Sequence, residues 1–249
     1  MDRAIRMEYL RAIGIDAWVP RAGIRGMTTA QAVVEAATAV ELAAAPSSTV
    51  SGGDGGWEAL RTEIMSCTRC SLYAGRTQGV LGVGNPQADW MVIGEAPGAE
   101  EDRRGEPFVG RAGQLLDAML RAIGLSRAEN VYIANVLKSR PPNNRDPRPE
   151  EVAACLPYLR RQIELVRPRL LLAVGRIAAQ NLLGTQESLG RLRGRVHRFG
   201  ELNTPLVVTY HPAYLLRTPA DKRKAWEDLK FARSVFRQLT AGSEDGHRS

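Results

Sequence analysis

The fold is decided by the stretch WMVIGEAPG, residues 90–98, in which an apolar run stops at a turn containing glycine and proline. Similar apolar runs follow at 131–137, 170–174 and 206–209. Their hydrophobicity is continuous rather than alternating, which is typical of strands that are buried on both faces of a sheet. The four runs therefore predict four central strands.

The segments between these runs carry apolar residues at helical spacing, at 114–123, 149–166 and 222–239. Strands separated by helices indicate a parallel sheet layered between helices. We therefore predict an α/β fold, a three-layer αβα sandwich. Ligands of such sheets bind beyond the carboxyl ends of the strands, so functional residues are expected where each run ends.

The chain of 249 residues is long enough for one main domain with appendages. The Ser/Gly-rich residues 46–56 have the composition of a flexible linker. This linker separates an N-terminal helical extension, residues 1–45, from the main domain, residues 57–240. The polar residues 241–249 are expected to form a disordered tail.

The chain carries a net charge of +7, which suits a polyanionic partner and equally suits a soluble protein from an arginine-rich genome. No apolar stretch is long enough to span a membrane, and residues 1–14 do not resemble a signal peptide. We therefore expect a cytoplasmic protein without a membrane partner. In that reducing compartment the pair Cys67 and Cys70, spaced Cys-x-x-Cys, predicts a metal or redox site.

Side chains with chemical potential gather near the ends of the runs. In chain order they are Gly94, Glu95, Glu101, Phe108, Asn135 and His211. The glycines after the first run match neither a dinucleotide-binding motif nor a P-loop. A carboxylate, an aromatic ring, an amide and an imidazole are therefore expected at one edge of the sheet.

The motifs Gly94–Gly98, Pro107–Gly113 and His211–Arg217, with Cys67 and Cys70 upstream, resemble family 4 uracil-DNA glycosylases. The resemblance covers roughly residues 57–238 in motif order and spacing, and several motifs in one order are more specific than any one alone. It implies a four-stranded parallel sheet and a monofunctional enzyme that flips uracil out of single- or double-stranded DNA. Hydrolysis of the N-glycosyl bond leaves an abasic site for base excision repair.

The same resemblance implies that Phe108 stacks on the uracil, that Asn135 pairs with its edge, and that Gly94 belongs to the binding turn. Ordinary core packing of Phe108 and a loop-capping role for Asn135 are the alternatives. Catalytic roles are implied for Glu95, Glu101 and for an imidazole, His211, near the leaving base. A carboxylate can stabilise the positive sugar and a donor can stabilise the departing uracil anion.

Some of the remaining charged residues are less specific. Glu100 and Asp102 fit a solvated acidic turn. Candidate phosphate contacts beside the pocket are Lys138, Arg140, Arg145 and Arg217. The arginines between 191 and 198 fit either an extension of this DNA-binding surface or one solvated face of a strand.

The resemblance also implies a structural 4Fe-4S cluster held by four cysteines. Cys67, Cys70 and Cys155 occupy three of the ligand positions, and Ser139 occupies the fourth. A serine oxygen is a harder and poorer ligand than a thiolate. We expect a cluster to be bound, either ligated by serine or as a labile three-iron form, while a cluster-free fold and a mononuclear zinc site remain alternatives.

Two other functions fit parts of the sequence. One is a glycosylase that prefers other deaminated bases, and the other is a non-catalytic DNA-binding or scaffolding protein derived from this fold. The presence together of Glu95, Phe108, Asn135 and His211 favours an enzyme. Residues 1–45 can bind a replication or repair partner or dock on the main domain. We expect the protein to be a monomer.

Overall fold

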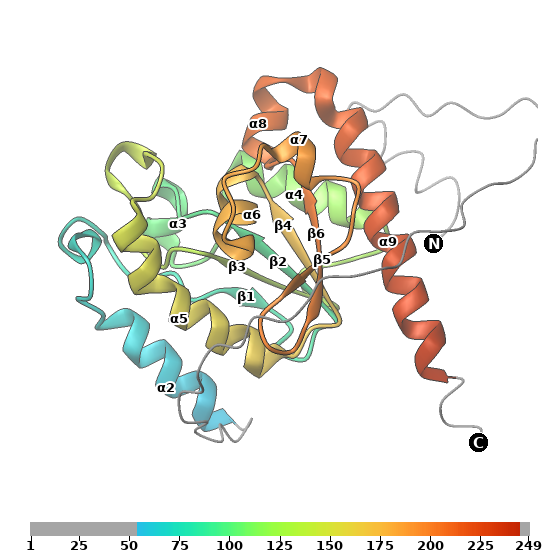
Figure 1. The fold of residues 1–249 in the computed structure, drawn as a ribbon. Helices are drawn as coiled ribbons and strands as arrows, with labels where there is room; N and C mark the ends of the chain where they lie inside the picture. The colour runs from blue at the N-terminus through green and yellow to red at the C-terminus, as the bar shows by residue number, and fades with distance from the viewer. Residues whose placement is uncertain (1–53, 245–249) are drawn as a thin grey trace, which may run out of the picture.

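The computed structural model describes residues 54–244. In this part of the chain, one sheet contains six strands in the order β1-β3-β2-β4-β6-β5. Its four central strands are parallel and coincide with the four predicted strands (Figure 1). They are β2 (Trp90–Gly94), β3 (Val131–Asn135), β4 (Leu170–Val174) and β6 (Thr204–Thr209). The predicted α/β fold is confirmed.

Two short strands extend this parallel core at its edges. β1 (Val83–Gly84) pairs antiparallel with β3, and β5 (His197–Phe199) pairs antiparallel with β6. The expected four strands are therefore correct for the parallel core but incomplete for the sheet. Such short strands cover backbone groups of the outer parallel strands that would otherwise invite pairing with another chain.

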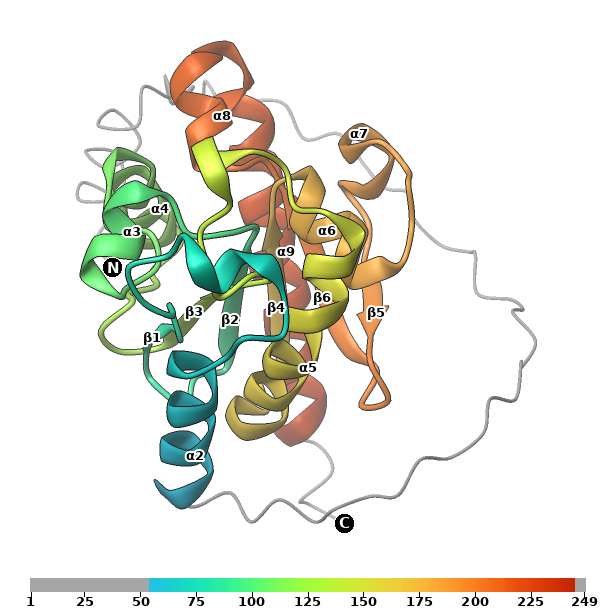
Figure 2. The same ribbon diagram turned by 90° about the vertical axis from the view of Figure 1, so that its left-hand side faces the viewer.

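Helices cover both faces of the sheet, as the sandwich prediction requires (Figures 1 and 2). α4 (Arg111–Ala122) and α9 (Lys222–Glu244) pack on one face, where they meet Trp90 and Val92 of β2. α5 (Pro149–Val166) and α6 (Arg176–Leu183) pack on the other, against Met91 and Ile93. Successive side chains of a strand point to opposite faces, so burial on both faces explains the continuous apolar run.

α2 (Asp54–Met65) packs outside this sandwich, against α5, through a small cluster that includes Leu60, Ile64 and Tyr158. It begins inside the segment predicted as a linker, and α9 continues into the predicted tail. The expected N-terminal extension, residues 1–45, lies outside the described residues. The short helical segments are η1 (Ser71–Ala74), α3 (Ala99–Arg104), η2 (Pro142–Asn144), α7 (Leu189–Leu192), α8 (Pro212–Arg217) and η3 (Pro219–Asp221).

Within residues 54–244, no helix has both the length and the apolar character needed to cross a membrane.

Candidate active site

The register of the two central strands β2 and β3 places Gly94 directly beside Asn135. A Cβ atom at Gly94 would lie 2.4 Å from Oδ1 of Asn135 and 2.6 Å from Cζ of Phe108. Both distances are shorter than van der Waals contact, so only glycine leaves room for the amide and the ring together. The structure thus brings the three expected binding residues into contact distance of one point.

Asn135 is 2% exposed, and its Oδ1 atom has no hydrogen-bond partner within the described part of the chain. A buried polar atom left unpaired costs about 1–3 kcal/mol. The backbone carbonyl of Asn135, in contrast, accepts a hydrogen bond of 2.6 Å from Nζ of Lys138. The main chain of Asn135 is therefore fixed, while its buried amide oxygen has no partner within the described residues.

Phe108 adopts a left-handed backbone conformation, with φ at 56°, which a bulky residue takes only where its surroundings enforce it. Arg127 is one such constraint, because its guanidinium donates to the carbonyls of Pro107 and Phe108 at 3.2 and 2.9 Å and pairs with Asp117. Gly113 is another, since a Cβ atom there would overlap the carbonyl of Phe108. The ring is therefore held by its backbone as well as by packing.

Glu101 holds the same loop from α3. Its Oε1 atom accepts hydrogen bonds from the backbone N–H groups of Val109 at 3.0 Å and Gly110 at 3.3 Å. The Oε2 atom lies 2.7 Å from the position of a Cβ on Gly98. The Glu101 carboxylate thus connects the turn after β2 to the start of α4, on the carboxyl side of Phe108.

The two acidic neighbours of Glu101 behave differently from each other. Glu100 is exposed and pairs with Arg103, as expected for a solvated turn. Asp102 is buried and accepts hydrogen bonds from the backbone and the hydroxyl of Thr77. The expectation of a solvated side chain is therefore wrong for Asp102, which instead ties α3 to the segment after η1.

His211 caps α8 and faces Phe108, with 5.5 Å between the ring centroids. Its Nδ1 atom accepts a hydrogen bond of 3.1 Å from the backbone of Ala213. Burial, aided by the charge of Arg217 and opposed by that of Glu101, lowers the pKa of His211 to about 4. At neutral pH the imidazole is therefore uncharged, and because Nδ1 accepts, its proton is assigned to Nε2.

Glu95 follows β2 directly and is half-buried. Burial and, to a smaller extent, the nearby charge of Asp146 raise the pKa of Glu95, Arg176 opposes them, and the result is a pKa of about 7. Asp146 and Arg176 form an exposed ion pair with 2.9 Å between Nη2 and Oδ2. The ionised fraction of Glu95 consequently changes most steeply around neutral pH.

The predicted phosphate contact through Lys138 is wrong. Lys138 is 1% exposed, and its ammonium donates to the Asn135 carbonyl and to Oε1 of Gln162, both at 2.6 Å. An ammonium that is buried in this way cannot reach a DNA phosphate. No carboxylate is among its hydrogen-bond partners in the described residues, and burial lowers the pKa of Lys138 to about 7.

The three arginines of the predicted phosphate set differ in their surroundings. Arg145 makes a two-point ion pair with Glu151, whose side chain is 1% exposed, and so closes the first turn of α5. Arg140 is half-buried and donates to Asn144 at 2.8 Å. Arg217 is exposed at the end of α8. Its charge contributes to the lowered pKa of His211.

The cysteine site joins three segments. Cys67 and Cys70 lie between α2 and η1, and Cys155 is buried on α5. Burial raises the pKa of Cys155, while Lys138 lowers it and the charges of Cys70 and Cys67 raise it further, which places the three thiols in one electrostatic neighbourhood. In residues 54–244, no three Cys, His, Asp or Glu side chains are already gathered as a metal-binding group.

Ser139, in the fourth expected ligand position, is buried and its hydroxyl accepts a hydrogen bond of 2.8 Å from Arg76. The same guanidinium donates to the carbonyls of Met65 at 2.6 Å and Cys67 at 3.2 Å. Arg76 therefore links the loop after β3 to the Cys67 loop. The four expected ligand residues thus occupy one region, which adjoins the buried ammonium of Lys138.

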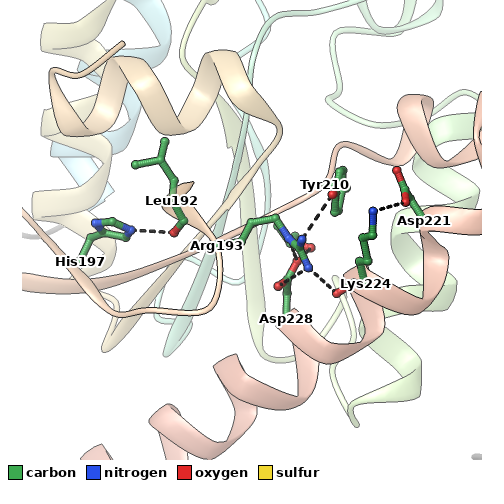
Figure 3. A network of polar contacts seen from close by, with 8 residues as sticks. Leu192, Arg193, His197, Tyr210, Asp221, Lys224 and Asp228 are labelled. Atoms are coloured by element: carbon green, nitrogen blue, oxygen red, sulfur yellow. Dashed lines mark hydrogen bonds and ion pairs between the residues drawn. The ribbon is translucent and has the colours of Figure 1, made fainter. Parts of the chain in front are cut away.

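Sequence reasoning missed the residues that support the site. Arg127 and Gly113 fix Phe108, and Arg193 is bound to Asp228 beside Tyr210, the residue before His211 (Figure 3). The two arginines carry no local signal, because an arginine in a segment after a helix is ordinarily solvated. Arg193 thus departs from both expectations for the basic stretch 191–198.

Comparison with known proteins identifies the family. A model of the uracil DNA glycosylase superfamily matches residues 81–230. A type-4 uracil-DNA glycosylase of Archaeoglobus fulgidus is 49% identical over 175 residues, which cover 68% of this chain and 87% of that protein. Type-4 enzymes of Pyrobaculum aerophilum and Thermotoga maritima are 45% and 42% identical, over 67% and 73% of this chain and 87% and 95% of theirs.

The family match spans the whole parallel core and all the residues gathered at its carboxyl edge, from Gly94 to His211. The pairwise identities extend over most of each relative. The chain therefore belongs to the uracil DNA glycosylase superfamily and, within it, to the type-4 uracil-DNA glycosylases.

Proposed function

We propose that Gly94, Phe108 and Asn135 form the pocket for uracil and that Glu95 and His211 assist cleavage. As a type-4 uracil-DNA glycosylase, the chain removes uracil from DNA by hydrolysing an N-glycosyl bond, in the service of DNA repair. A base inside a duplex is out of reach of such groups, so the target nucleotide must rotate into the pocket.

The observation that carries this assignment is the unpaired Oδ1 atom of Asn135 beside Gly94 and the Phe108 ring. Uracil presents an N3–H donor next to a carbonyl oxygen. The amide of Asn135 offers an acceptor and a donor in the complementary order. Cytosine has an unprotonated N3 and an amino donor, so both hydrogen bonds would be reversed and the buried amide would stay unsatisfied.

His211 and Glu95 suit the charge that develops as the bond breaks. The electron pair of the bond between N1 and C1′ leaves with uracil, and a neutral imidazole can donate its Nε2 proton in a hydrogen bond to that anion. The sugar becomes positive, and an ionised Glu95 stabilises it and takes a proton from the water that adds to C1′. At neutral pH these roles fall to an uncharged His211 and to the ionised fraction of Glu95.

Glu101 supports this chemistry indirectly in our proposal. Its carboxylate is occupied by the backbone N–H groups of Val109 and Gly110, so it is less available to water than Glu95. It keeps the loop that carries Phe108 in place. We therefore assign the role of activating water to Glu95 and a positioning role to Glu101.

Replacing Asn135 with Asp tests the pocket. The carboxylate keeps the acceptor but loses the amide donor, and it brings a charge into a buried site. We expect single-turnover excision of uracil to fall by about 100-fold or more, as for loss of a buried specific hydrogen bond, while DNA affinity stays unchanged. Asn143→Asp, on an exposed loop, is the matched control. Excision at the wild-type rate in Asn135→Asp would contradict the assignment.

We further propose that Cys67, Cys70 and Cys155, with Ser139 in the fourth ligand position, would hold an iron-sulfur cluster. The donors fit in kind, because three thiols share one electrostatic neighbourhood. The fully buried Lys138 also fits, because burial lowers its pKa to about 7 and an anionic cluster nearby would stabilise its charged form. When bound, the cluster would cross-link the three segments and take no part in bond cleavage.

A further inference from the structure

The segment that carries His211 rests on a buried polar network, drawn in Figure 3. Arg193, which follows α7, has a side chain that is 15% exposed. Its Nε and Nη2 atoms donate to the two carboxylate oxygens of Asp228 at 2.6 and 2.8 Å, and Nη2 also donates to the Lys224 carbonyl at 2.8 Å. This two-point geometry anchors Arg193 on α9.

The network reaches the end of β6 through two residues that precede His211. The hydroxyl of Thr209 donates to Oδ2 of Asp228 at 2.8 Å. The guanidinium of Arg193 lies over the ring of Tyr210, 4.4 Å from its centroid, and donates to its hydroxyl at 3.3 Å. The backbone leading into His211 is therefore fixed by two consecutive side chains.

A second set of contacts holds the segment after His211. Tyr210 stacks on Tyr214 of α8, with centroids 5.3 Å apart and ring planes at 13°. The Tyr214 hydroxyl donates to Asp221 at 2.6 Å, and Asp221 pairs with Lys224 at 2.8 Å. His211 thus lies in the sequence between Tyr210 and Tyr214. Both tyrosines are connected to α9 through these contacts, Tyr210 by way of Arg193 and Tyr214 by way of Asp221.

We propose that Arg193 is a positioning residue, which together with Asp228 fixes the junction of β6 and α8 so that His211 presents its Nε2–H group to the pocket. This inference rests on the role proposed above for His211. A contact of Arg193 with DNA phosphate is disfavoured, because its donors are already directed inward at Asp228, Tyr210 and the Lys224 carbonyl.

The chemistry of the pair explains why an arginine is needed. A guanidinium can serve two carboxylate oxygens while lying flat on an aromatic ring, whereas an ammonium cannot do both. The side chain of Asp228 is 3% exposed, and burial raises its pKa while Arg193 and Thr209 oppose that shift. Loss of Arg193 would leave this carboxyl buried without its main partner and would loosen Thr209 and Tyr210.

Loosening of the segment has a consequence at His211 itself. The charged groups that act on His211 are Arg217, from its own helix, and Glu101, from α3. Gly175, at the end of β4, contacts it without charge, since a Cβ there would lie 2.9 Å from the His211 Cβ. Burial is the main cause of the low pKa, so water admitted by a loosened segment raises the pKa.

The test is an imidazole NMR titration of the complete chain, which contains three histidines. In the wild type we expect His211 to stay neutral with its proton on Nε2 down to about pH 4. In Arg193→Met we expect the pKa of His211 to rise toward the ordinary value, about 6.5, with a mixture of tautomers, and single-turnover excision to fall about 10- to 100-fold. Arg193→Lys should restore the positive charge but neither the low pKa of His211 nor the wild-type excision rate.

Arg195→Met is the matched control, because Arg195 makes an exposed ion pair with Glu187 two positions along the same segment. We expect it to leave the His211 titration unchanged. Tyr210→Phe, which removes one hydrogen bond only, keeps the test possible if Arg193→Met does not fold, and should shift the titration in the same direction by less.

The outcomes separate this inference from the proposed function. An unchanged His211 titration in folded Arg193→Met, Arg193→Lys and Tyr210→Phe would overturn the positioning role. A shifted titration in those variants, combined with full activity of His211→Gln, would uphold the positioning of the ring and instead refute its role in excision.

Discussion

The position of the Phe108 ring depends on an unusual backbone conformation at that residue. Its φ of 56° is maintained by Arg127, Glu101 and the missing side chain of Gly113. Such conformations cost of order 1–3 kcal/mol and persist where the surroundings enforce them. The ring is therefore placed before any base arrives, which reduces the ordering that binding must impose.

Replacing Phe108 with Ala should remove the stacking surface for uracil. Stacking of a base on an aromatic side chain contributes about 1–3 kcal/mol, so we expect single-turnover excision to slow by about 5- to 150-fold. Phe199→Ala, which removes a ring of similar burial on β5, controls for lost packing. Equal loss of rate in both variants, or no loss in Phe108→Ala, would contradict the stacking role.

Glu95 makes excision depend on pH near neutrality. Because its pKa is raised to about 7 and its charged form is needed, the rate should increase as the pH rises through 7. Asp146→Asn removes a negative neighbour, so it should lower the pKa of Glu95 and move the half-maximal rate to lower pH. Arg176→Gln should move it to higher pH.

Single-turnover rates between about pH 5 and 9, a range that brackets the raised pKa, measure these shifts. Asp89→Asn, which breaks an exposed ion pair with Arg169 near the opposite ends of the strands, is the matched control and should leave the profile unchanged. If the Asp146→Asn and Arg176→Gln variants both had the pH profile of the wild type, Glu95 would not control the rate.

At the level of strands and helices, the apolar pattern predicted the parallel core because each of its strands is buried at every position. The edge strands lack this pattern. β5 buries Phe199 but leaves Arg198 exposed, and β1 contains only two residues, so neither produces a continuous run. Edge strands depend on pairing with a neighbour more than on their own hydrophobicity.

Lys138 illustrates why the site could be predicted only in part. The strand pattern places it near the carboxyl edge of the sheet, and because lysine is rarely fully buried, the sequence favours a side chain in solvent. Burial in fact continues without interruption from β3 through Ser139. The side chain is accepted in the interior because the Asn135 carbonyl and Gln162 bind its amino group and because burial lowers its pKa to about 7. Neither partner shows this role in the sequence, since one acts through its backbone and the other lies on α5.

At the scale of the whole molecule, the cysteine site connects three segments that are distant in the sequence: the loop after α2, the loop after β3, and α5. Ser139→Cys should supply a fourth thiolate, raise the iron content of anaerobically purified protein and increase its resistance to heat. Each kcal/mol gained should raise the unfolding midpoint by about 2–4 °C. Uracil excision should change little, since the pocket residues are retained.

Iron and sulfide analysis with a thermal unfolding curve provides the measurement. Ser188→Cys adds a thiol at an exposed position away from the site and serves as the control. A wild-type protein that is colourless, iron-free and fully active would contradict the cluster proposal. In that case Arg76, through Ser139 and Cys67, would hold the loops together by hydrogen bonds alone.

α9 begins beside the segment that carries His211 and leads away from it along the sheet (Figure 1). Its 23 residues correspond to about 34 Å at 1.5 Å per residue. Gln238, an exposed position in the second half of α9, therefore lies about 24 Å along the helix from its start. A fluorophore or surface tether introduced there would let single enzymes be watched on DNA without blocking the strand's approach.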